Sequence, residues 1–209
     1  MIQQFSNSVD RKSARKSLKK NEHHQHPRPI PPPEKDYELK EYFVTIDSRD
    51  RDRTIWPNAN QFQVKMEPES SYKGATLNRA FKNIRSIEVL SVQFPNTNQV
   101  LDQMYLYLCF PELDGVFEST SMIGTKAIAK LEPYAAIGNF VLVKYDTKYP
   151  KLIFPDKGLS RLTALTVEFR KYDGTLFNFG TDTTPPTTVN PVLQTSITLR
   201  VVVQVPNSG

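Results

Sequence analysis

The sequence predicts an all-β protein, a single jelly-roll-like β-sandwich that carries an extended N-terminal arm. Three observations lead to this fold class. Strand-favouring residues are frequent, with 12 Phe and 9 Tyr beside many Val and Thr, and 16 Pro interrupt the chain. Several short segments alternate apolar and polar residues with a period of two. No segment indicates a long helix, and 209 residues suit one sandwich plus an appendage.

Residues 1–36 form the arm, and residues 37–209 form the sandwich. The arm contains eight Lys/Arg and four Asp/Glu, whereas the other 173 residues contain 19 basic and 18 acidic side chains. Residues 27–33 (PRPIPPP) favour polyproline II, and the arm has too little apolar surface to order alone. We therefore expect its basic residues to bind a partner: Arg11, Lys12, Arg15, Lys16, Lys19, Lys20 and Arg28.

The first strands of the sandwich are expected at residues 42–46, 61–66, 84–94 and 104–110. The segment 61–66 alternates strictly, which is typical of a half-buried strand. In 84–94 the apolar parity changes at Leu90, which indicates a bulge or burial on both faces. The run 104–110 is continuously apolar and favours a central strand.

The later strands are expected at residues 140–145, 151–154, 165–170, 175–179 and 196–205, giving eight or nine in all. Asp173-Gly174 predicts a two-residue hairpin turn that joins 165–170 to 175–179. A polar Thr/Pro loop follows at 181–191. In the last strand Ile197, Leu199, Val201, Val203 and Val205 share one face.

Residues suited to catalysis are few. The three histidines (23, 24 and 26) all lie in the arm, the lone Cys109 lies in an apolar run, and only eight glycines are present. We therefore expect no zinc cage, no phosphate-binding loop, no cofactor and no enzymatic activity. No apolar stretch reaches the length of a membrane span, and no signal peptide is expected, which indicates a soluble chain made in a reducing compartment.

One dense polar cluster follows the first strand, and three interpretations of it stay open. Its charged residues are Asp47, Arg49, Asp50, Arg51, Asp52 and Arg53. They could form a cation site, although the interleaved arginines oppose this, or a strand-ending loop with internal ion pairs, or a contact between subunits. The single tryptophan, Trp56, either caps the core or anchors a partner.

The order of these motifs resembles the minor capsid proteins of nucleocytoplasmic large DNA viruses, including those of chlorella-type viruses. Three segments carry the likeness: IDSRDRD (46–52) followed by WPNANQFQV (56–64), IEVLSVQFPNT (87–97) running on to YLYL (105–108), and residues 162–179. The arm lies outside the resemblance.

The resemblance implies a structural protein of the inner capsid shell. Such a cement protein contacts major capsid proteins and other minor capsid proteins, is made in the host cytoplasm and resides in the virion. A vertex (penton) protein is an alternative of the same size. A second alternative is a virion protein that binds DNA or the inner viral membrane through the arm, with nucleic acid less favoured because no aromatic residues accompany the arm's basic ones.

Overall fold

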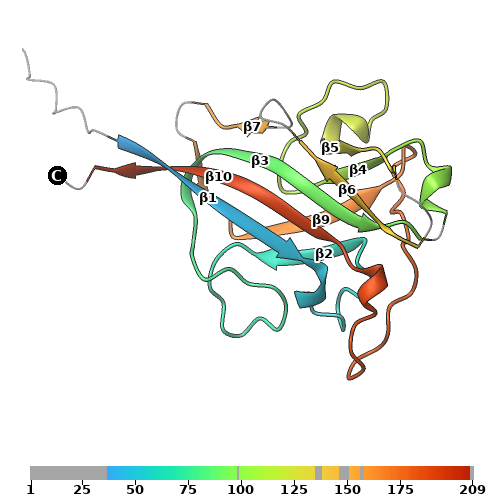
Figure 1. Cartoon of the computed structure of the whole chain (residues 1–209). Coiled ribbons are helices and arrows are strands. Elements are labelled where there is room, and N and C mark those ends of the chain that lie inside the picture. The colour runs from blue at the N-terminus through green and yellow to red at the C-terminus, as the bar shows by residue number, and fades with distance from the viewer. Residues whose placement is uncertain (1–36, 98, 135–137, 146–150, 156–157, 208–209) are drawn as a thin grey trace, which may run out of the picture. The chain divides into compact units, whose positions relative to one another are not determined.

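A computed structural model describes residues 37–97, 99–134, 138–145, 151–155 and 158–207, which form two antiparallel sheets packed face to face (Figure 1). The arm lies outside the described residues. Ten strands are present in this part of the chain, and its helical turns are short 3-10 turns. The expected all-β sandwich is therefore confirmed.

The larger sheet has the strand order β1-β10-β3-β6. It contains β1 (Tyr37–Asp47), β10 (Ser196–Pro206), β3 (Lys82–Pro95) and β6 (Phe140–Lys144). Two short strands, β7 (Lys151–Ile153) and β8 (Leu159–Arg161), also pair with β3, so β6, β7 and β8 pair with successive stretches of it. The second sheet has the order β2-β9-β4-β5, formed by β2 (Gln61–Lys65), β9 (Ala164–Arg170), β4 (Leu106–Cys109) and β5 (Ala127–Leu131).

The core lies between the two sheets and is rich in aromatic side chains. Phe94 of β3 and Phe169 of β9 have ring centroids 6.2 Å apart, and Phe179 packs against both rings. The expected apolar face of β10 is confirmed, since Ile197 to Val203 in alternate positions are buried and Val205 packs against the same core. Cys109 is buried, as expected of a small apolar side chain.

The expected irregularity at Leu90 is a β-bulge. In the pairing of β3 with β10, Ser91 lies opposite Thr198 and Val89 lies opposite Leu199, so Leu90 has no opposite residue in that ladder. The change of apolar parity in the sequence was therefore a correct signal of a break in register.

Several expectations about strands and turns differ from the structure. The strand expected at 104–110 spans only Leu106–Cys109, because Met104 is exposed and Phe110 enters a turn. The turn after β9 is a three-residue loop, Tyr172–Gly174, closed by a hydrogen bond from Lys171 N to Thr175 O. Gly174, at φ +85°, supplies the left-handed residue that ends such a loop.

The return segment after this loop is also shorter than expected. Residues 175–179 form only one isolated bridge, Arg170 to Leu176, instead of a strand. The strands β5 and β8 were not expected, because each is short and β5 contains small alanines between its apolar residues.

Candidate functional site

The polar cluster lies at the end of β1, in a segment of residues 47–56 that we call the motif loop. Asp47 closes β1 and accepts a hydrogen bond from the backbone N–H of Arg49 at 2.9 Å. The Arg49 guanidinium also pairs with the Asp47 carboxylate on the surface. These contacts fix the short 3-10 turn Ser48–Asp50 (η1), and the Arg49–Asp47 pair is internal to the cluster.

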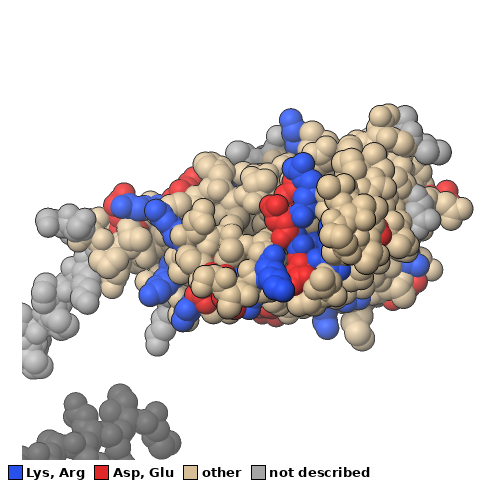
Figure 2. Space-filling view, turned by 90° about the horizontal axis from the view of Figure 1, so that it is seen from below, with Lys and Arg blue, Asp and Glu red and all other residues tan. Residues whose placement is uncertain are grey.

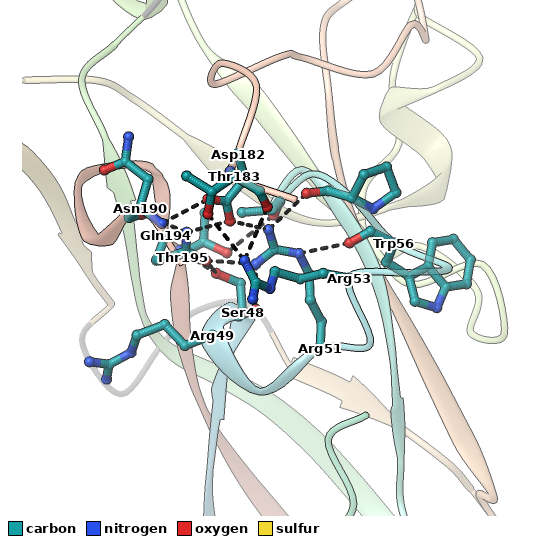
Figure 3. A network of polar contacts seen from close by, with 12 residues as sticks. Ser48, Arg49, Arg51, Arg53, Trp56, Asp182, Thr183, Asn190, Gln194 and Thr195 are labelled. Atoms are coloured by element: carbon teal, nitrogen blue, oxygen red, sulfur yellow. Dashed lines mark hydrogen bonds and ion pairs between the residues drawn. The ribbon is translucent and has the colours of Figure 1, made fainter. Parts of the chain in front are cut away.

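Arg51 is the centre of the motif loop, and its side chain is 0% exposed (Figure 3). A guanidinium has five N–H donors, and all five are used here. Its acceptors are the backbone oxygens of Ser48, Trp56 and Pro57, Oε1 of Gln194 and Oδ2 of Asp182. The expectation that Arg51 contacts a partner subunit is therefore corrected: the side chain has no exposed surface to offer, and it ties the loop to the rest of the fold.

Asp182 is the ionic partner of Arg51. It lies in the Thr/Pro loop, its side chain is 1% exposed, and its Oδ2 is 2.6 Å from Arg51 Nη2. Burial alone would raise the pKa of this carboxyl. Hydrogen bonds from the backbone N–H of Asn190, the Gln194 amide, the backbone N–H of Thr183 and Arg51 outweigh burial and lower the pKa to about 2.

Arg53 makes a second link between the same two loops. Its guanidinium donates to the backbone oxygen and hydroxyl of Thr183, at 3.0 and 3.1 Å, and to the backbone oxygen of Thr187. A third link joins Ser48 to the two residues just before β10, since Ser48 Oγ donates to Gln194 and accepts from Thr195 N at 2.8 Å. The motif loop and the Thr/Pro loop are therefore held as one rigid polar unit at this end of the sandwich.

The remaining members of the motif loop lie nearer the surface. Asp50 is exposed, and the Asp52 carboxylate accepts hydrogen bonds from the hydroxyl and N–H of Thr54, which lower its pKa. Trp56 is half-buried and packs against the main core, as expected if it caps the core. Its indole points away from the polar contacts drawn in Figure 3.

Metal ligands are not gathered in the part of the chain that the structure describes. No three His, Cys, Asp or Glu side chains there lie close enough together to hold an ion. In the motif loop, Asp47 instead pairs with Arg49, and Asp52 is engaged by Thr54.

Two buried carboxylates on the outer faces of the sheets were not foreseen. Glu88 of β3 pairs with Arg200 of β10, which also lies 3.9 Å from Glu41 of β1. On the other sheet, Glu168 of β9 pairs with Arg170 at 2.6 Å and accepts from Gln61. The sequence alternation places these opposite charges on the outer faces of their strands. Predicting which charges pair, however, requires the strand register, which the sequence alone does not give.

A cleft of about 640 Å³ lies beneath the segment that connects β4 to β5. This segment covers the outer face of the second sheet, where Tyr107, Cys109 and Ala127 form a small second core. Burial raises the pKa of the Cys109 thiol to about 12, so the thiol at the edge of this cleft is a poor nucleophile.

Charged side chains of both signs lie side by side in a band on the face shown in Figure 2, next to a broad region without charges. That face therefore carries no patch of a single sign such as a phosphate backbone attracts.

Comparison with known proteins gives one family. Residues 35–133 match the model of a protein family of unknown function, DUF5901. The matched segment begins just before β1, includes the motif loop and ends after β5, so Arg51 lies inside it and Asp182 outside. No curated protein matches the chain. Among the described residues, no helix has the length and apolar character needed to cross a bilayer.

Proposed function

We propose that this protein is a structural subunit of an icosahedral viral shell, a minor capsid (cement) protein of a large DNA virus. The observation that carries the proposal is the nesting of its strand pairs. The first strand pairs with the last (β1 with β10), the second with the second last (β2 with β9), β3 with β6 to β8, and β4 with β5. A long hairpin that rolls up on itself would produce this order, so the strand pairing supports a jelly roll as the architecture of the proposed subunit.

A jelly roll alone does not define a function, because lectins and cupins share it with viral capsid proteins. The resemblance of the motif loop and the central strands to minor capsid proteins favours the capsid among these. The hydrogen bonds between the two loops also favour a capsid role, because the Arg51 and Arg53 guanidinium groups of the motif loop donate to the Thr/Pro loop and hold the two loops in place. Interfaces gain affinity from surfaces that are ordered before binding.

In this role the sandwich supplies a rigid body between neighbouring subunits, and the basic arm binds along an adjacent protein. Because the arm is tethered to the body, its contact becomes effectively intramolecular, so a weak arm contact adds strongly to retention in the shell.

The test is quantitative mass spectrometry of purified particles of the virus that encodes the chain. We expect the protein at a fixed ratio to the major capsid protein, retained after a salt wash and after removal of the internal DNA. Absence from particles, or release together with the DNA, would overturn the proposal. Release with the DNA would support the alternative of a DNA-bound virion protein.

A further inference from the structure

The long edge of the larger sheet is formed by β1. All eleven residues of β1 pair with β10 without a break, and among the described residues no other strand pairs with β1. The strand contains no proline, glycine or bulge. Proteins usually protect such edges with short strands, prolines, bulges or charges, and of these β1 carries only charges, at Glu38, Lys40, Glu41 and Asp47. The other outer strands are shorter, with five residues in β2, β5 and β6 and three in β7 and β8, so β1 is the edge best suited to accept a further strand.

An apolar row accompanies this edge. Tyr37, Leu39 and Phe43 point to one face of β1 and are 50%, 61% and 69% exposed. The first five residues of β1 are exposed on both faces, and Figure 1 shows β1 and the end of β10 extending together beyond the neighbouring strands. Two-stranded ribbons are marginally stable in water, so this ribbon would gain from a third strand.

We propose that β1 pairs antiparallel with β1 of a second copy of the chain, with the two-fold axis at Leu39. In this register Glu38 of each copy lies opposite Lys40 of the other, and the two Leu39 side chains lie side by side. Glu38 and Lys40 are half-exposed and 3.6 Å apart within one strand, so four charges of alternating sign would surround the axis.

Other registers are less favourable. If the axis lies at Glu38, Lys40 or Glu41, a residue faces its own copy and like charges lie opposite each other, which destabilises a strand pair. An axis at Tyr42 places no opposite charges together. The sequence of charges in Glu38-Leu39-Lys40 therefore favours a second copy of the chain as the strand that pairs with β1. It also favours the register with the axis at Leu39. A contact of this kind is isologous, as in most dimers.

The described pairing region is short, Tyr37 to Glu41, so its interface falls below the size of stable dimers. We expect a dissociation constant in the micromolar range. The inference does not depend on the proposed function. If the chain dimerises in solution but is absent from particles, the dimer stands and the capsid role fails.

The test is sedimentation equilibrium of the full chain over a wide concentration range. The weight-average mass should rise from 23.9 kDa toward twice that value. Glu38→Lys and Lys40→Glu each create two like-charge pairs and should weaken dimerisation by about tenfold or more. Mixing the two variants restores Glu–Lys pairing in a heterodimer, and the double variant E38K/K40E restores the homodimer. Both positions are exposed, so the variants should fold, which circular dichroism checks.

A matched control is Glu132→Lys, an exposed charge change on another strand end, which should leave dimerisation unchanged. Three results would overturn the proposal: a wild-type chain that stays monomeric at several hundred micromolar, single variants that dimerise like the wild type, or a mixture of single variants that fails to recover association.

Discussion

Arg51 and Asp182 lie 131 residues apart in the sequence and form an ion pair with almost no exposure, 0% and 1% for the two side chains. The pair joins the loop after β1 to the loop before β10, the two strands that pair as first and last. The consequences of this arrangement can be measured.

Removing one charge of this pair should be costly. We expect Asp182→Asn to lower the free energy of unfolding by about 3–5 kcal/mol, because Arg51 would remain buried without a counter-charge. Urea denaturation of the purified protein measures the change. The matched control is Arg49→Ala, which breaks an exposed pair and should lower the free energy of unfolding far less than Asp182→Asn. Equal effects of the two substitutions would show that the buried pair has no special role.

The same pair makes stability depend on acid pH. The pKa of Asp182 falls from its ordinary 3.8 to about 2 in the folded protein, so its stabilisation is complete above the unfolded value and is lost as the pH falls from about 4 to about 2. The contribution is about 2 kcal/mol, since one pKa unit corresponds to about 1.4 kcal/mol. The stability difference between the wild type and Asp182→Asn should shrink by this amount over that range in urea titrations. A stability difference that is independent of pH would contradict the lowered pKa of Asp182.

Burial should protect the single thiol. Because burial raises the pKa of Cys109 to about 12, almost none of the thiol is ionised near neutral pH in the folded protein. We expect a chromogenic disulfide reagent to modify Cys109 slowly in native buffer and rapidly in denaturing urea. Fast stoichiometric labelling of the native protein would show that the thiol is accessible.

The aromatic centre of the sandwich should dominate its stability. Phe169→Ala should cost about 3–5 kcal/mol, because it leaves a cavity beside Phe94 and Phe179. Phe43→Ala removes the same atoms from a surface position and should change the unfolding free energy by less than about 1 kcal/mol. Similar losses at the two positions would argue against the described core.

The sequence predicts the fold wherever a local pattern decides it. Alternation located β2 and β10, and the change of parity at Leu90 located a bulge. The local pattern failed where strand pairing determines the structure. The first five residues of β1, Tyr37 to Glu41, are rich in charge and form a strand because β10 lies beside them.

The candidate site could be predicted only in part. The density of charge in residues 47–53 marked the right loop, and its ion pairs were among the interpretations. Nothing local distinguishes buried Arg51 from exposed Arg49, because the difference comes from Asp182 and Gln194, which reach Arg51 only after folding. Long-range polar contacts of this kind have no periodic signal in the sequence.

Deleting residues 1–36 should separate folding from assembly. The main core described here is formed by side chains from Val44 onward, so we expect the truncated chain to unfold at the same urea concentration as the full chain. The truncated chain should enter particles less efficiently, which quantitative mass spectrometry of particles carrying either form measures. Equal incorporation would mean that the arm does not hold the protein in the shell.

The most direct measurement is a reconstruction of the purified virus particle at a resolution that separates strands. We expect density for this sandwich at repeated positions in contact with major capsid proteins, with the Thr/Pro loop and its arginine-anchored base at or near a subunit boundary. A complete shell in which every sandwich-shaped density belongs to other proteins would contradict the role of this chain as a capsid component.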